Sequence, residues 1–179
     1  MTVGLFGGTF DPPHNGHVAL VDAAERVFSF DRLLVLVVAA PGHRRVVASA
    51  DVRLALTRLA FPDHTVELDE HERTIDLLRA RELEDPVFLI GADELADFPN
   101  WKEPETVLEL ARLGVATRPG YAVAAAISPV DRVEPFEIDP HPVSSTEIRR
   151  KVAASEPIDG LVPDAVVREI ERLGLYRNL

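Results

Sequence analysis

The segment GLFGGTFDPPHNGH, residues 4–17, concentrates residue types that suit phosphate binding. Gly7 and Gly8 directly follow a short apolar run, and glycine lets a backbone approach a ligand closely and adopt conformations closed to other residues. His14 and His17 stand at the far end of the segment, beside the expected N-terminus of a helix. Free backbone N–H groups at a helix N-terminus bind phosphate oxygens, and two imidazoles would add donors beside them. The segment therefore predicts a phosphate-binding turn; the alternative is a tight turn in which the histidines only cap the helix.

A second candidate phosphate site is the segment SSTEIRR near residue 150. Ser144 with Glu147 fits the pattern of a capping box, so a helix is expected to begin here. Ser145, Thr146 and Arg149 would then lie at the helix N-terminus, where free N–H groups and a guanidinium suit the terminal phosphates of a nucleotide. The alternative is an ordinary capped helix on the surface.

Other candidate residues follow apolar runs of the chain. Gly91 and Asp93 come directly after the run at residues 86–91, where Asp93 would contact a ligand or cap a short helix. Arg118 follows another apolar run in the same way. Trp101 is the single tryptophan of the chain. A lone tryptophan is more often a core residue than a ligand contact, but its place in a loop flanked by proline and asparagine favours the site.

The short basic segment PGHRR, residues 41–45, follows an apolar run. Arg44 or Arg45 could bind a substrate phosphate there. A solvated basic turn is the alternative interpretation.

Six histidines and the absence of cysteine bear on metal binding. Without cysteine, disulfides and thiolate metal sites are excluded. The histidines match no zinc-site spacing, because His14 and His17 lie in a Gly/Pro turn that lacks a third ligand. We therefore expect no protein metal site, and Mg²⁺ held mainly through nucleotide phosphates and water.

Apolar runs that alternate with amphipathic stretches would position these residues. Strands are expected at residues 2–6, 32–40, 64–68, 86–91 and 112–117, with one more near 132–138. The runs Leu33–Val38 and Val87–Ile90 are apolar throughout, as in strands covered on both faces. Repeated strand–helix alternation predicts an α/β fold with a doubly wound parallel sheet. In such a sheet, ligands bind at the carboxyl ends of the strands where the strand order reverses.

The amphipathic stretches predict the helices. Residues 17–28 are expected to form a helix that buries one apolar face: Leu20, Val21, Ala24, Val27 and Phe28. Asp51 would cap the next helix, which would bury a second apolar set: Leu54, Ala55, Leu59 and Ala60. Pro104 suits the first turn of a further helix.

A small helical part is expected at the C-terminal end. Its last helix would run from Pro163 to about Leu173, with Gly174 as the stop. No repeat, linker or low-complexity tract interrupts the chain, so we expect one domain over residues 1–179.

Composition narrows the partners and the compartment. The formal net charge is −11 and the isoelectric point about 4.9, which disfavours nucleic acid polymers and anionic membranes as partners. The chain shows no basic leader and no apolar run of membrane-spanning length, so a cytoplasmic location is expected. The oligomeric state stays open, with a homo-oligomer as one alternative.

The motifs together resemble the nucleotidyltransferase superfamily, whose H-x-G-H element is similar to His14–His17 here. Three further segments resemble those of bacterial nicotinate-mononucleotide adenylyltransferases: FLIGADELADFPNWK (88–102), RLGVATRPGY (112–121) and SSTEIRRKV (144–152). The ending VPDAVVREIERLGLYR is similar as well. The resemblance implies a Rossmann-like nucleotidyltransferase fold. It also implies transfer of AMP from ATP to nicotinic acid mononucleotide with Mg²⁺, giving nicotinic acid adenine dinucleotide and pyrophosphate in NAD biosynthesis.

The resemblance, added to the residue patterns, assigns the site residues. The catalytic set is His14, His17 and Arg149. The ATP-binding set is Gly7, Gly8, Thr9, Phe10, His14, Gly16, His17, Gly91, Asp93, Arg118, Ser145, Thr146 and Arg149. The mononucleotide-binding set is Thr9, Arg44, Arg45, Thr74 and Trp101, with the tryptophan stacking on the pyridine ring.

Three alternatives to this function remain at the level of sequence. The first is an adenylyltransferase that prefers nicotinamide mononucleotide. The second is another enzyme of the superfamily, such as a phosphopantetheine adenylyltransferase or a cytidylyltransferase. The third is a nucleotide-binding protein without catalysis.

One segment bears on the choice between acid and amide. The acid-selective members of the family carry a Ser/Tyr–Thr segment before the helix that follows strand three. Here HERTIDLL keeps Thr74 and Asp76 but has Glu72 and Arg73 where the aromatic residue would be. If Arg73 points inward it would favour a carboxylate on the ring, whereas an inward Glu72 would oppose it. We predict a preference for the acid.

Overall fold

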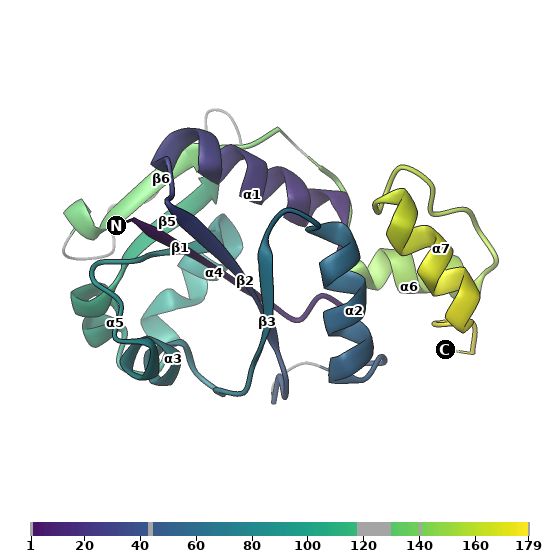
Figure 1. Ribbon diagram of the computed structural model, residues 1–179, viewed down its shortest axis with the longest axis horizontal. Helices are drawn as coiled ribbons and strands as arrows, with labels where there is room; N and C mark the ends of the chain where they lie inside the picture. Colours follow the sequence, from purple (N-terminus) through teal and green to yellow (C-terminus); the bar gives the residue numbers. More distant parts are fainter. Residues whose placement is uncertain (1, 43–44, 118–129, 140, 179) are drawn as a thin grey trace.

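The computed structural model describes residues 2–42, 45–117, 130–139 and 141–178. These residues form one parallel sheet with the strand order β3-β2-β1-β4-β5-β6, which Figure 1 shows with helices on both of its faces. The strands are β1 (Val3–Gly8), β2 (Arg32–Val38), β3 (Thr65–Asp69), β4 (Val87–Gly91), β5 (Arg112–Thr117) and β6 (Val133–Glu137). This arrangement confirms the predicted doubly wound parallel sheet.

The helices divide between the two faces of the sheet. One face is covered by α1 (Asn15–Phe28) and α2 (Ala50–Ala60), and the core on that side continues into α6 (Ser145–Ala153) and α7 (Asp164–Leu173). The other face is covered by α3 (Thr74–Arg81), α4 (Ala92–Asp97) and α5 (Pro104–Leu110). In Figure 1, α6 and α7 lie at one end of the molecule, next to α2. None of the helices in the described part of the chain is long and apolar enough to cross a membrane.

The central strands explain why two cores form. Successive side chains of a strand point to opposite faces of the sheet. Along β2, Leu33, Val35 and Val37 accordingly pack under α1 and α2. The intervening Leu34 and Leu36 pack under α3, α4 and α5. The strand is therefore apolar without interruption, as the sequence predicted.

The reversal of strand order determines where a ligand can bind. β1 pairs with β2 on one side and with β4 on the other, so successive crossovers leave β1 in opposite directions. The loops after β1 and β4 are thus separated by a crevice at the carboxyl edge of the sheet. The phosphate-binding segment predicted from the sequence begins at this edge, because β1 ends at Gly8.

The structure corrects the expected first turns of two helices. α1 begins at Asn15, not at His17, and His14 is its N-cap residue. α2 is capped by Ser49, whose Oγ accepts a hydrogen bond from the Val52 N–H at 3.4 Å, so Asp51 lies within the first turn. A serine side chain can accept from the third N–H of a helix as well as an aspartate can, so the preceding Ser49 caps α2 in place of the predicted Asp51.

The buried face of α2 also differs from the prediction. Ala60 is buried as expected, but Leu59 is 38 % exposed and Ala55 is exposed. Arg53, Leu56 and Thr57 occupy the buried face instead. The guanidinium of Arg53 donates to four backbone carbonyls in the interior. The side of α2 that carries Arg53 therefore faces the core, and the side that carries Leu59 faces outward. On α1, Val27 is 57 % exposed because it lies in the last turn, near the end of the apolar face.

The remaining helix predictions agree with the structure, except for the capping box expected at Ser144 and Glu147. Pro104 is the first residue of α5. Ser144 caps α6 through its Oγ, which accepts from the Glu147 N–H at 3.2 Å. Glu147 itself binds Arg150 rather than completing a capping box. Gly174 follows α7 in the left-handed region, with φ at +63°, where a residue without Cβ is least strained.

Candidate active site

Two cavities meet at the carboxyl end of β1. The larger has a volume of about 690 Å³ and the smaller about 480 Å³. Both are lined by Gly7, Gly8, Thr9 and Glu94, so the end of β1 forms the boundary between them. A molecule in one cavity would therefore lie close to a molecule in the other.

The glycine at the end of β1, Gly8, is explained by packing and not by an unusual dihedral angle. Gly7 and Gly8 lie in the extended strand, and neither has a positive φ. This corrects the expectation of conformations closed to other residues. A Cβ on Gly8 would lie 2.6 Å from Cζ of Phe10, so the buried phenylalanine ring requires a glycine there. Phe10 itself adopts a φ of +50°, which folds its ring back onto the strand.

The two histidines of the N-terminal motif are stacked on each other. Their ring centroids are 3.6 Å apart and the ring planes differ by 19°. Only His17 is among the residues that line the smaller cavity, and His14 is buried behind it with 9 % exposure. Nδ1 of His17 accepts a hydrogen bond from the backbone N–H of His14 at 3.1 Å. The neutral ring of His17 therefore carries its proton on Nε2, from which it can donate.

Burial sets the charge of His14. Desolvation, with a smaller contribution from the nearby His141, lowers the pKa of its imidazole from 6.5 to about 4. At neutral pH the ring is thus uncharged. A neutral His14 ring can support His17 by stacking without adding a positive charge to the turn.

This pKa makes the stability of the protein depend on pH. The unfolded chain binds a proton at His14 with a pKa near 6.5, whereas the folded chain does so only near 4. The contribution of His14 to stability is therefore fully present above pH 6.5 and is lost as the pH falls from 6.5 to 4. We expect His14 to account for a loss of about 2 kcal/mol in the free energy of unfolding between pH 7 and pH 5.

Urea unfolding at both pH values measures this loss. In the His14→Asn variant, whose asparagine is a good N-cap residue, the loss between pH 7 and pH 5 should be smaller by that amount. Identical losses in the two proteins would show that His14 is not kept neutral by burial.

The N-terminus of α6 lies against the N-terminal motif. Ser145 Oγ donates to the carbonyl of Pro12 at 2.8 Å, and Arg149 Nη1 donates to the carbonyl of Asp11 at 2.7 Å. Ser145, Thr146 and Arg149 all line the smaller cavity, where His17 also lies. The structure thus brings together the two segments that the sequence predicted to bind phosphate, although they lie near opposite ends of the chain.

Of the two candidate arginines in the basic segment after β2, the structure describes Arg45. Arg45 lines the smaller cavity with His17 and Arg149, not the cavity that contains Trp101. The sequence had assigned it to the mononucleotide, and its place favours phosphates that lie beside His17. Arg44, the alternative candidate, and Arg118 are outside the described residues.

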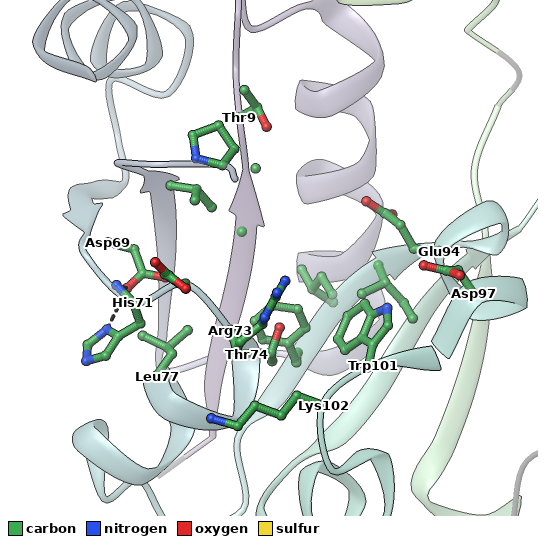
Figure 2. Close-up of a pocket in the computed structure, with 18 of the residues that line it drawn as sticks. Thr9, Asp69, His71, Arg73, Thr74, Leu77, Glu94, Asp97, Trp101 and Lys102 are labelled. Atoms are coloured by element: carbon green, nitrogen blue, oxygen red, sulfur yellow. Dashed lines mark hydrogen bonds and ion pairs between the residues drawn. The ribbon is translucent and has the colours of Figure 1, made fainter. Parts of the chain in front are cut away.

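The larger cavity has an aromatic wall. Trp101 is half-buried, and its ring contacts Phe88 and Phe98 at centroid distances of 6.2 and 5.3 Å. Figure 2 shows the indole and the side chain of Arg73 directed into the same space, with Thr74 beside them. In the part of the chain that the structure describes, the side chain of Arg73 has no hydrogen bond or ion pair. A flat aromatic ligand with an anionic substituent would fit this arrangement.

The two acidic residues in the first turn of α4, which follows β4 directly, have different roles. Glu94 lines both cavities, and its carboxylate accepts a hydrogen bond from the Gly91 N–H at 2.7 Å. Asp93 is exposed and lines neither cavity, and the N-cap of α4 is Gly91. The alternative interpretation, in which Asp93 caps α4, is thus wrong, because Gly91 is the N-cap residue. The assignment of Asp93 to ATP binding stays a prediction. Gly16, on α1, packs against the ring of His14 and lines neither cavity either.

Sequence reasoning missed several polar residues of the larger cavity. Asp69 and His71 face it as a pair, with Oδ1 of Asp69 and Nδ1 of His71 2.7 Å apart. Lys102 lies at its rim and binds the carboxylate of Asp76. Asp69 ends β3 at the carboxyl edge of the sheet, and that position was the signal that could have found it.

A buried arginine, also missed, holds the boundary between the cavities. Arg53 is 1 % exposed, and its Nη1 donates to the carbonyls of Thr9 and Val38 at 2.8 Å each. Its other nitrogens donate to Ala39 and Ala48. The guanidinium thus ties the end of β1 to the end of β2. Nothing in its helical pattern distinguishes it from a surface arginine.

The donors present do not form a cage for a metal ion. Among the described residues, no three His, Asp or Glu side chains are grouped so that they could hold one.

Known proteins resemble this chain over nearly its full length. A protein of Thermus thermophilus named "Probable nicotinate-nucleotide adenylyltransferase" is 42 % identical over 189 residues, covering 99 % of this chain and all of that protein. One of the same name from a Roseiflexus species is 36 % identical, covering 98 % of each chain. Such similarity over the whole length extends through both cavities.

Solved structures share the fold. Nicotinic acid mononucleotide adenylyltransferase of Plasmodium falciparum, in complex with NaAD, superposes with a TM-score of 0.79 at 18 % identity, covering 98 % of this chain and 97 % of that one. The same enzyme in complex with APC gives a TM-score of 0.76 at 17 % identity, covering 98 % of this chain and 96 % of that one. The model of the cytidylyltransferase-like family matches residues 5–151, which contain the N-terminal motif and most of α6. The chain therefore belongs to the cytidylyltransferase-like family, as the resemblance of its motifs predicted.

Proposed function

We propose that this protein is a nicotinate-nucleotide adenylyltransferase, which transfers AMP from ATP to nicotinic acid mononucleotide. The products are nicotinic acid adenine dinucleotide and pyrophosphate. The observation that carries the proposal is the pair of cavities that share the end of β1: one has the aromatic wall of Trp101, and the other has His17 and Arg149. Full-length relatives named for this activity support it.

The chemistry needs two substrates held end to end. An oxygen of the mononucleotide 5′-phosphate attacks the α-phosphorus of ATP, and the bond to the bridging oxygen of pyrophosphate breaks. The attacking phosphate is already anionic at neutral pH, so no general base is required. The protein contributes position and neutralisation of charge. With the pyridine ring on Trp101 and the triphosphate beside His17, the two phosphates would meet at Gly8 and Thr9.

The donors around the smaller cavity suit the transferring group. Nε2 of His17 would donate to an oxygen of the α-phosphate, where charge shifts during transfer. Arg149, with Arg45 lining the same cavity, would hold the departing pyrophosphate. The N-terminus of α6 would add backbone N–H groups and the favourable end of the helix dipole. When bound, Mg²⁺ would neutralise charge on the phosphate oxygens of ATP.

An assay of released pyrophosphate tests the proposal. The full-length protein is given ATP and Mg²⁺ with one acceptor at a time: nicotinic acid mononucleotide, nicotinamide mononucleotide, phosphopantetheine or no acceptor. We expect turnover with the pyridine mononucleotides and a dinucleotide product identified by its mass. Binding of ATP without turnover of any acceptor would contradict the enzymatic function, and turnover of phosphopantetheine alone would contradict the substrate.

A further inference from the structure

The last turn of the chain returns to the N-terminal motif. Tyr176 OH donates a hydrogen bond of 2.8 Å to Oδ1 of Asp11, a residue 165 positions earlier. Both side chains are buried, with 4 % and 2 % exposure. Gly174 and Tyr176 both have positive φ, and these two left-handed residues turn the backbone back after α7. A non-glycine residue in that region persists where surrounding contacts hold it.

Asp11 connects three segments that carry the smaller cavity. Its Oδ2 accepts from the Val47 N–H at 2.7 Å, and its Oδ1 accepts from the Ala48 N–H at 3.2 Å. Its backbone carbonyl accepts from Arg149 Nη1, an atom that also lies 4.0 Å from Oδ2. Asp11 therefore positions the guanidinium of Arg149 and the segment directly after Arg45.

Tyr176 is the one side-chain donor on the Asp11 carboxylate in the described part of the chain, besides the more distant Arg149. The other two donors are backbone N–H groups of a loop. Burial, together with the negative charge of Asp11, raises the pKa of the Tyr176 phenol, so the hydroxyl keeps its proton at every working pH. The hydroxyl of Tyr176, in the turn that follows α7, therefore donates to the Asp11 carboxylate throughout the working pH range.

We propose that Tyr176 is a positioning residue for AMP transfer, which acts through Asp11 to hold Arg149 in the geometry that the departing pyrophosphate requires. Tyr176 lines neither cavity, so it would not touch the substrate. Because its test measures turnover, this proposal rests on the proposed function. Small displacements of a charged group that binds a reacting phosphate cost large factors in rate, because the binding geometry must match the transition state.

The test begins with Tyr176→Phe, which removes the hydroxyl and keeps the packed ring. Initial rates of pyrophosphate release are measured against ATP concentration, with nicotinic acid mononucleotide saturating. We expect kcat to fall about tenfold with a smaller change in KM for ATP, since a misplaced Arg149 still attracts the triphosphate. An unchanged kcat would overturn the proposal.

A matched control separates positioning from stability. Thr57→Val also removes a buried hydroxyl, which donates to the Arg53 carbonyl at 2.7 Å, but Thr57 lines neither cavity. We expect both variants to lower the melting temperature by a few degrees, and only Tyr176→Phe to lower kcat. Equal losses of kcat in the two variants would mean that the tyrosine acts only through stability.

A double-mutant cycle identifies the route. If Tyr176 acts through Arg149, then Tyr176→Phe changes kcat by less than about twofold in an Arg149→Ala background. A full tenfold effect in both backgrounds would overturn the proposed route. The ATP dissociation constant, measured by calorimetry on the same four proteins, is the second readout. If the unmodified protein turns over no acceptor, the proposed function fails, and the positioning role is decided by whether the two substitutions are non-additive in ATP binding.

Discussion

Replacing His17 with alanine is expected to lower kcat by about 10²- to 10³-fold while the KM for ATP changes much less. The ring lines the smaller cavity, and its Nδ1 is occupied by the backbone N–H of His14, which leaves Nε2 as the donor. A donor held in place before the reaction stabilises charge that develops in the transition state more than charge in the ground state. The effect should therefore appear in kcat.

Steady-state rates for the His17→Ala variant, with ATP varied, measure this directly. His64→Ala is the control, because His64 is a partly buried histidine that pairs with Glu25 and lines neither cavity. We expect the control to keep kcat within about twofold. A rise in KM at unchanged kcat would mean that His17 binds the ground state and the transition state equally.

The second large effect concerns the acid or amide group on the pyridine ring. We expect kcat/KM for nicotinic acid mononucleotide to exceed that for nicotinamide mononucleotide by roughly ten- to hundredfold. The first N–H groups of α3, at Thr74 and Ile75, have no helical partner by position and would donate to both oxygens of a carboxylate. A carboxamide would turn an NH₂ group toward one of them and leave a buried donor unpaired, at about 1–3 kcal/mol.

Arg73 strengthens this expectation. The sequence left its direction open, and the side chain points into the cavity beside Trp101 (Figure 2). A guanidinium there adds a charge-assisted interaction that only the acid can accept. Glu72 lines the same cavity, and its negative charge opposes binding of the acid. We therefore expect the preference for the acid in kcat/KM to be about hundredfold at most.

The two mononucleotides are compared side by side in the unmodified protein and in Arg73→Gln. We expect the substitution to lower kcat/KM for the acid and to leave the amide nearly unchanged. Arg79→Gln is the matched control, since Arg79 lies on α3, the helix whose N-cap residue is Arg73, pairs with Glu103 and lines neither cavity. Equal values for acid and amide in the unmodified protein would contradict the assignment to an acid-specific enzyme.

The architecture was predictable from the sequence because its signals are local. The uninterrupted apolar runs at Leu33–Val38 and Val87–Ile90 correspond to strands buried on both faces. The pattern of strands and helices, in turn, predicted the parallel sheet and the edge at which ligands bind. The segments 4–17 and 144–150 were predicted separately to bind phosphate, and the structure brings them to one cavity. Which of their atoms touch ATP stays a prediction.

The errors arose where a local pattern had two solutions. Leu59 and Arg53 both lie on plausible buried faces of α2, and hydropathy favours the leucine. The fold buries the arginine because the carbonyls of Thr9, Val38, Ala39 and Ala48 converge on one point and need donors. In the same way, Gly8 suggested a special backbone conformation, whereas its reason is the ring of Phe10 above an extended strand.

Sequence alone thus determined the class of fold, the family and the chemical types at the site, since these depend on periodicity and on motifs within a few residues. Only the tertiary structure decided that Arg45 shares a cavity with His17 while Arg73 shares one with Trp101. It also decided that Tyr176 reaches Asp11 across almost the whole length of the chain. Such contacts join residues that are far apart in sequence. Which donors reach a buried carboxylate depends on distance and direction in the folded molecule, and the spacing of residues along the chain does not specify these.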